Sequence, residues 1–197
     1  MMEWVMNILK QIYPAFAITV VLTALLGVIY PLVVTGLALV MFPAKAGGSL
    51  IEKDGKVIGS SLIGQPFSGP GYFHSRPSAA GSGYDGTASG GTNLGPTNQK
   101  LMDNVKAASE SLREENPGSP VPIDMVTASA SGLDPHITPA AAEFQVPRVA
   151  TQRGVNAEEV RRLVREHTEG RQFGVLGEPR VNVLELNLAL NSVRPMQ

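Results

Sequence analysis

The sequence predicts an α+β protein in which one N-terminal transmembrane helix is followed by a single soluble domain with a small sheet and about four helices. A long uncharged apolar run lies near the N-terminus. The remaining ~150 residues suffice for one domain, and several segments among them have an apolar helical face that needs a shared core. The expected boundaries are an N-terminal segment at 1–14, the transmembrane helix at 15–42 and the soluble domain at 43–197.

The apolar run contains 34 residues without a charged side chain and lies between Lys10 and Lys45. A helix needs about 20 residues to cross a hydrocarbon core of about 30 Å. The 28 residues from Ala15 to Phe42 exceed that length, so we expect the helix to tilt or to protrude at one end. Pro14 is expected in the first turn, and Pro43 is expected to end the helix.

A cleavable signal peptide is the alternative interpretation of this run, since Ala44-Lys45-Ala46 resembles a cleavage site. Signal peptides have an apolar region of about 7–15 residues, which is much shorter than this one. We therefore expect an uncleaved anchor.

Small or polar residues recur every four positions along one slowly turning face of the predicted span. Such residues let a second helix approach closely in lipid, so they predict packing against a partner helix, although spans also tolerate threonine and glycine without a partner. Pro31 also leaves the carbonyl group of Gly27 without its helical donor, which predicts a kink. The residues of this stripe are Thr19, Thr23, Gly27, Pro31 and Thr35.

Composition and motifs argue against several kinds of site. Sixteen basic and 17 acidic residues give a net charge of −1 without a basic patch, so no nucleic-acid partner is expected. The chain has no cysteine, which excludes disulfides and thiolate sites. Neither a nucleotide-cradling glycine-rich loop nor a G-x-S-x-G nucleophile motif is present. The 3 histidines (His74, His136 and His167) lack metal-ligand spacing, so no catalytic or metal residue is assigned.

The first part of the soluble domain combines a hairpin with a long loop. Ser49 to Gly59 is typical of a hairpin with Asp54-Gly55 at its turn. Ser68 to Asn98 is rich in glycine, proline and serine, as flexible linkers are, yet it also carries aromatic and charged side chains. We therefore expect an ordered loop that docks onto a partner, with candidate docking residues Tyr72, Phe73, Arg76 and Tyr84.

Helices dominate the rest of the predicted domain. Thr97 is expected to cap a helix that ends near Glu115. Thr138-Pro139 has the form of an N-cap followed by proline, and the helix that it begins is expected to break or kink at Pro147 and to end by Gly154.

The remaining elements are read from capping patterns and short apolar runs. A further helix is expected from Asn156 to Gly170. Ile123 to Val126 and Gln172 to Leu176 are expected to be strands. Val183 to Val193 is predicted to be a helix from the capping-box spacing of its first residues, with a strand as the alternative.

Several long stretches, together with the single span, resemble the KdpC family, the C subunits of the Kdp potassium-transporting ATPase. The resemblance covers essentially the whole chain, and the stretches occur in the family's order. They are Tyr72–Ser78, Tyr84–Gly86, Ser89–Asn98, Asp124–Ala142, Gln145–Ala150 and Val181–Leu190.

The resemblance implies a non-catalytic assembly subunit in a bacterial or archaeal inner-membrane complex for potassium uptake. Its implied partners are a channel-like potassium-binding subunit, a P-type ATPase catalytic subunit, a small single-span subunit and membrane lipid. No firmly bound cofactor is expected, because ATP is used by the catalytic partner. A single-span, membrane-anchored extracytoplasmic sensing or binding module is the alternative from another class.

Two implications of the resemblance conflict. The family's proposed role as a catalytic chaperone, which raises the ATP affinity of the catalytic subunit, makes Gln145 a nucleotide contact. The family also places the soluble domain on the outer face, where it cannot reach cytoplasmic ATP. The lysines that follow the span (Lys45, Lys53 and Lys56) mildly favour a cytoplasmic domain, but long domains translocate largely regardless of charge. We adopt the outer placement.

Overall fold

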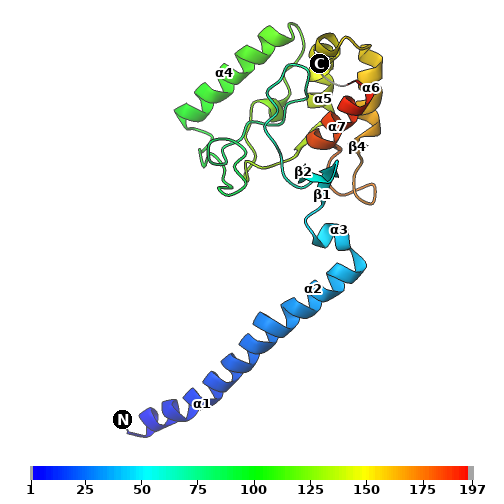
Figure 1. Cartoon of the computed structure of the whole chain (residues 1–197). Helices are drawn as coiled ribbons and strands as arrows, with labels where there is room; N and C mark the ends of the chain where they lie inside the picture. The colour runs from blue at the N-terminus through cyan, green and yellow to red at the C-terminus, as the bar shows by residue number, and fades with distance from the viewer. Residues whose placement is uncertain (1, 195–197) are drawn as a thin grey trace. The chain divides into compact units, whose positions relative to one another are not determined.

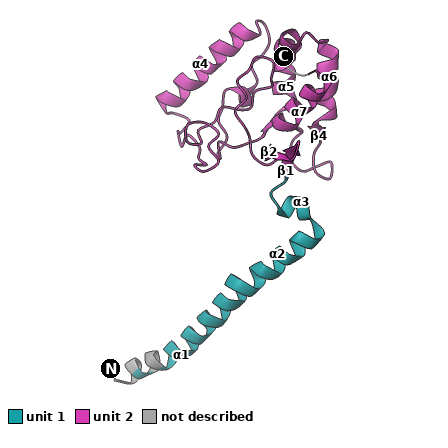
Figure 2. Ribbon diagram, in the orientation of Figure 1, with its two compact units in different colours: residues 1–49 teal, residues 50–197 magenta. Residues whose placement is uncertain are grey.

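The computed structural model describes residues 2–194 and divides the chain into two compact units, Met1–Ser49 and Leu50–Gln197 (Figure 2). Unit 1 is helical, and unit 2 combines helices with two small sheets (Figure 1). The predicted α+β class is therefore confirmed. The elements of unit 1 are α1 (Met2–Ala24), the π-helical turn η1 (Leu25–Ile29), α2 (Tyr30–Met41) and α3 (Pro43–Ala46).

The predicted long apolar helix is present in unit 1. Residues Lys10–Met41 form a continuous helical stretch of 32 residues, and an 18-residue window within it has a mean hydropathy of 2.5, so the stretch is long and apolar enough to cross a membrane. The position predicted for Pro14 is wrong, because α1 begins at Met2 and Pro14 lies inside it. Near the other end, α2 stops at Met41, and Pro43 opens the short helix α3.

The irregularity predicted near Pro31 takes the form of a π-helical turn. Pro31 lies in the first turn of α2, directly after η1. Because proline has no N–H group, it cannot donate to the carbonyl group of Gly27. A wider π turn is a common local irregularity inside a long helix, and it lies at the predicted place, whereas the kink itself stays a prediction.

Unit 2 is built on three helices and a three-stranded antiparallel sheet of order β3-β5-β4. The central strand β5 pairs Val181 with Ile137 of β3 and with Thr168 of β4. Apolar residues of α5, α6, α7 and β5, including Val146, Val160 and Leu186, form the core. The bounds are β3 (His136–Ile137), α5 (Pro139–Arg153), α6 (Ala157–Glu166), β4 (Thr168–Glu169), β5 (Arg180–Asn182) and α7 (Val183–Val193).

The predicted hairpin is confirmed. Strands β1 (Leu50–Lys53) and β2 (Lys56–Ser60) pair antiparallel. Asp54 and Gly55 at the turn have φ angles of 53° and 73°, as a type I′ turn requires at both central positions.

Helix α4 (Gln99–Glu115) contributes little to the core, and none of its residues is fully buried. Leu112 is its side chain that packs against the core cluster. The capping residue differs from the prediction, since Asn98, and not Thr97, accepts the hydrogen bond from the backbone N–H of Lys100 at 2.9 Å. In Figure 1 this helix lies to one side of the group formed by α5, α6 and α7.

Helix α5 begins as predicted but does not break. The Thr138 hydroxyl accepts from the backbone N–H of Ala141 at 3.1 Å, and Gly154 ends the helix in the left-handed conformation. Pro147 lies inside the helix, where proline costs about 3 kcal/mol. Val146 and Val149 on either side of it are fully buried, so apolar burial offsets that cost and keeps the helix continuous.

Both strands predicted from short apolar runs are wrong. Residues Ile123–Met125 form the short 3-10 helix η2, and Gln172 and Leu176 form one isolated bridge across a tight turn. The predicted end of the next helix at Gly170 is also wrong, because α6 stops at Glu166 and the chain enters β4, which pairs with β5.

The C-terminal element is a helix, as predicted, and not a strand. The side chain of Asn182 accepts from the backbone N–H of Glu185 at 3.2 Å and so caps α7. Asn156 caps α6 in the same way, through the backbone N–H of Glu158.

The long loop that contains residues 68–98 is ordered, as predicted, although it contains neither helix nor strand in its described backbone. Hydrogen bonds connect this loop to the segment that precedes β3. The backbone N–H of Gly90 donates to Ser131 at 2.9 Å, and the Ser78 hydroxyl donates to the carbonyl group of Gly132 at 2.6 Å. Hydrogen bonds to a distant segment thus replace regular secondary structure in the loop.

Candidate functional site

The centre of unit 2 is the segment Tyr72 to His74, whose backbone is bound by side-chain amides and not by a neighbouring strand. Asn187 of α7 accepts from the backbone N–H of Phe73 and donates to its carbonyl group, both at 2.9 Å. Gln145 of α5 does the same for His74, accepting at 2.7 Å and donating at 3.1 Å. We call this four-bond arrangement the amide clamp.

Every hydrogen-bonding position of the Gln145 amide is occupied. Its oxygen also accepts from Nη2 of Arg148 at 2.8 Å, and its nitrogen also donates to the carbonyl group of Ala141 at 3.2 Å. An amide offers two donors and two acceptor lone pairs. Gln145 is fully buried as well, so its side chain serves the interior of the domain.

Two arginines of α5 secure the same segment. Arg148 donates to the carbonyl groups of Pro70 and Tyr72 and forms an ion pair with Glu115 of α4 at 2.7 Å. Arg153 is buried and donates to the carbonyl group of Gly71.

The Arg153 guanidinium also binds the C-terminal end of α7 and an aromatic ring. It donates to Oδ1 of Asn191 at 2.9 Å and lies 4.8 Å from the centre of the Tyr72 ring. Planar guanidinium groups stack well on aromatic rings, so this contact also orients Tyr72.

His74 is the last residue of the clamped segment, and its side chain is half-buried. One ring nitrogen lies 3.1 Å from the carbonyl oxygen of Gly69. Burial and the positive charge of Arg148 lower the pKa of His74. A neutral imidazole therefore suits this place, where a second cation beside Arg148 would be unfavourable.

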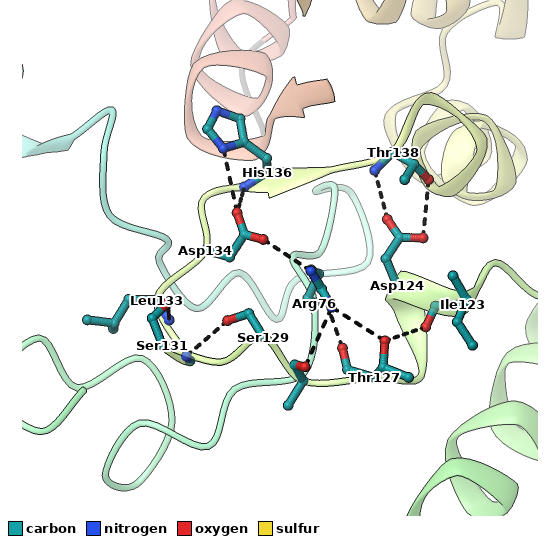
Figure 3. Close-up of polar contacts among 12 residues, drawn as sticks. Arg76, Ile123, Asp124, Thr127, Ser129, Ser131, Leu133, Asp134, His136 and Thr138 are labelled. Carbon is teal, nitrogen blue, oxygen red and sulfur yellow. Dashed lines mark hydrogen bonds and ion pairs between the residues drawn. The ribbon is translucent and has the colours of Figure 1, made fainter. Parts of the chain in front are cut away.

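Arg76 links the long loop to the segment that precedes β3 (Figure 3). Its Nη1 lies 3.2 Å from Oδ2 of Asp134, and its Nε donates to the carbonyl group of Thr127 at 3.4 Å. The Tyr84 hydroxyl donates to the carbonyl group of Arg76, and burial raises the pKa of this phenol. Tyr84 and Arg76 thus hold each other in place within the loop.

Asp134 is shared between Arg76 and His136. Oδ1 accepts from the backbone N–H of His136 at 3.0 Å and lies 3.5 Å from its Nδ1 (Figure 3). Burial alone would raise the pKa of this carboxyl group, but the hydrogen bonds from His136 and the charge of Arg76 outweigh it and lower the pKa. Asp134 is therefore an ionised anchor of the loop.

Asp124 is a buried carboxylate with a structural role. Its two oxygens accept from the backbone N–H and the hydroxyl of Thr138, at 2.7 and 3.1 Å. It therefore fixes η2 against the N-terminus of α5. Among the described residues, no group of three or more histidine and acidic side chains could hold a metal ion.

The predicted docking residues occupy different environments. Phe73 is fully buried in the core, so its ring is not available to a partner in this structure. Tyr72, Arg76 and Tyr84 are partly exposed and each contacts another part of unit 2. Their role in docking stays a prediction.

The stripe predicted on the span (Thr19, Thr23, Gly27, Pro31 and Thr35) is exposed along its whole length. The Thr19 hydroxyl donates to the carbonyl group of Ala15 at 2.8 Å, which satisfies this polar group within the helix. A Cβ added at Gly27 would meet only the Thr23 methyl group, at 3.9 Å. The helix itself therefore leaves room for a neighbour at this point.

Sequence reasoning missed Asn187, Arg148 and Arg153. Asn187 carried a usable signal, since it is a polar residue one position after Leu186 and three before Leu190 on the apolar face of α7. A buried amide needs partners, so this placement indicates a backbone segment that crosses the helix. The two arginines lie beyond Pro147, where the sequence predicted that the helix would break or kink.

Comparison with known proteins identifies the same family by a family model and by individual relatives. The family model described as "KdpC: K+-transporting ATPase, c chain" matches residues 12–192. The chain belongs to the KdpC family.

Relatives along the whole length support this membership. A protein of Koribacter versatilis, named potassium-transporting ATPase KdpC subunit, is 62% identical over 187 residues, which cover 95% of this chain and 97% of the relative. Proteins of the same name from Rhodopseudomonas palustris and Rhodospirillum rubrum are 54% and 56% identical, over 94% and 95% of this chain and 100% and 98% of theirs.

Membership in the KdpC family makes the chain a subunit of the potassium-transporting ATPase complex. Among residues 2–194, one long apolar helix near the N-terminus can anchor such a subunit in the inner membrane. The clamp residues lie in α5 and α7, inside the matched range of 12–192.

The clamp generates a prediction about stability. Gln145→Met keeps the length and volume of the side chain but leaves the backbone N–H and carbonyl groups of His74 without partners. Since each of these two groups costs about 1–3 kcal/mol when it is left unsatisfied, we expect the free energy of unfolding to fall by about 2–6 kcal/mol. The change is measured by unfolding the full chain with denaturant in detergent and monitoring the transition by near-ultraviolet circular dichroism.

Gln152→Met is the matched control, because Gln152 lies on the exposed face of the same helix. We expect it to change stability by less than about 0.5 kcal/mol. Equal stability of the two variants would contradict the importance of the clamp.

Proposed function

We propose that this chain is a non-catalytic accessory subunit that assembles and stabilises the potassium-transporting complex. The observation that carries the proposal is the use of its buried polar side chains. Gln145, Asn187 and Arg153 all hydrogen-bond to the chain's own backbone and give the segment from Gly71 to His74 a fixed shape. A domain built in this way suits docking onto a larger partner.

The sequence supports the non-catalytic part of the proposal. It lacks the Asp-Lys-Thr-Gly loop that P-type pumps phosphorylate and the Thr-Val-Gly-Tyr-Gly pattern of potassium filters. ATP hydrolysis and ion selection then belong to a catalytic subunit and a channel-like subunit, with a small single-span subunit completing the complex. The chain itself needs no firmly bound cofactor.

A direct role of Gln145 in nucleotide binding fits poorly with its surroundings. Its amide is fully buried and its donors and acceptors are occupied, so a nucleotide would have to displace the clamp. If the chain raises the ATP affinity of the catalytic subunit, it acts through subunit contacts. A catalytic-chaperone effect of that kind is compatible with the assembly role.

We place the soluble domain on the outer face of the membrane. In that position it can lie over the entrance for potassium and cannot compete for cytoplasmic ATP. Protease added to intact spheroplasts should then digest unit 2 and leave a protected fragment that contains the span. Digestion only after lysis would contradict this orientation.

The accessory role is tested by leaving the chain out of the complex. Membranes that contain the other subunits alone should lose potassium-stimulated ATPase activity and high-affinity potassium uptake together, while the purified chain should hydrolyse no ATP. Normal assembly and pumping without the chain would overturn the role in assembly. Hydrolysis by the purified chain would overturn its non-catalytic character.

The stripe on the span supplies a residue-level test of assembly. Gly27→Leu places a bulky side chain where we propose that a helix of the channel-like subunit approaches, and should reduce co-purification of the partners in mild detergent. Val21→Leu adds one methylene group at another exposed position of α1 and should leave co-purification unchanged. Equal recovery of partners with both variants would count against the stripe.

A further inference from the structure

The loop between β4 and β5, residues 170–179, carries the most exposed large apolar side chain among the residues that the structure describes. Phe173 is 92% exposed, and Val175 and Leu176 beside it are 73% and 56% exposed. We call these three residues the apolar tip. Adjacent apolar side chains held in water mark an interaction site more strongly than scattered ones do.

The loop is closed at its base by backbone hydrogen bonds and an ion pair. The backbone N–H groups of Gln172 and Leu176 donate to each other's carbonyl groups at 2.8 and 2.9 Å. Below the tip, Arg171 and Glu178 form an ion pair at 2.7 Å across the neck of the loop. Phe173 also has a φ of 53°, a left-handed conformation that bulky residues rarely adopt.

The tether to the membrane helix enters unit 2 beside this loop. In Figure 1 the loop between β4 and β5 lies at the same end of unit 2 as β1, where Leu50 begins the domain. Leu50 and Val57 of the hairpin are themselves 55% and 56% exposed, which adds apolar surface at this end.

The tether is short. Eight residues separate Met41, the last residue of α2, from Leu50, and four of them form α3. A fully extended chain spans at most about 3.6 Å per residue, and a helix only about 1.5 Å. The chain between Met41 and Leu50 can therefore span at most about 30 Å, so a short covalent tether gives unit 2 a high effective concentration next to the bilayer.

We propose that the apolar tip inserts into the lipid surface and forms a second membrane contact of the chain, in addition to the span. This inference rests on membrane anchoring and is independent of the role in assembly. Three side chains are far fewer than the 20–30 residues per partner of a standard protein interface. A bilayer interface, in contrast, accepts single aromatic and aliphatic side chains.

The charged residues near the apolar tip determine whether insertion requires lipids with anionic headgroups. Arg171 is paired with Glu178, and Arg180 is paired with Glu169 at 2.8 Å. The base of the loop thus carries no excess positive charge that would attract anionic lipids. Insertion should therefore occur in zwitterionic membranes and should resist high salt.

A nitroxide scan of the full chain tests the proposal. The chain contains no cysteine, so each variant carries a single label. The label at Val175→Cys should collide more with oxygen, which concentrates in lipid, than with a water-soluble nickel chelate, in phosphatidylcholine vesicles at both low and high salt. Adding Phe173→Ser to the Val175→Cys variant should lower the ratio of oxygen collisions to nickel collisions several-fold, because the label then lies in water.

Two labelled controls separate the outcomes. Met102→Cys on α4 is an exposed apolar position that should remain accessible to nickel, and Val33→Cys in α2 should report lipid. The label at Val175 could be as accessible to nickel as the label at Met102 while the label at Val33 reports lipid. The span would then be anchored in the membrane, and insertion of the apolar tip would be overturned. If the Val175 label became shielded from both reagents, and only in the assembled complex, a partner protein would cover the tip and the lipid contact would also be overturned.

Discussion

Unit 2 depends on the hydrogen bonds between two side-chain amides and one buried backbone segment. The segment from Tyr72 to His74 passes through the core without a neighbouring strand, yet buried N–H and carbonyl groups need partners. Asn187 from α7 and Gln145 from α5 provide four of these bonds. Two helices that are separated in sequence are thereby joined through a segment more than 70 residues away from either amide.

Much of the remaining architecture follows from this segment. Once it is fixed, Arg76 lies within reach of Asp134, whose carboxylate also binds the backbone N–H of His136 at the start of β3. Strand β3 then pairs with β5, which leads directly into α7 and back to Asn187. The polar interactions therefore form a closed hydrogen-bond network in which each element positions the next. A network whose polar groups are all satisfied favours one packing arrangement of the core over alternative arrangements.

Local chemistry made part of the fold predictable. Thr138 and Asn182 cap helices as expected, and Asp54-Gly55 forms the hairpin turn, because each depends on neighbours within a few residues. The strand predicted from Ile123 is wrong, because a distant hydrogen bond from Thr138 to Asp124 favours a 3-10 turn there. Tertiary burial keeps α5 continuous through Pro147, so the predicted break does not occur, and the alternative, a kink, stays a prediction. The resemblance located the stretches around Tyr72 and Gln145 without showing that these two contact each other, which only the folded chain determines.

The central claim is that hydrogen bonds from side-chain amides stabilise the backbone of Phe73 and His74 as well as regular secondary structure would. Native-state hydrogen exchange of the full chain tests it directly, with the exposed loop residue Gly86 as a reference. We expect the backbone amides of Phe73 and His74 to exchange as slowly as those in the middle of α5 and α7, which open only on global unfolding. Exchange of Phe73 and His74 at the rate of Gly86 would contradict the account.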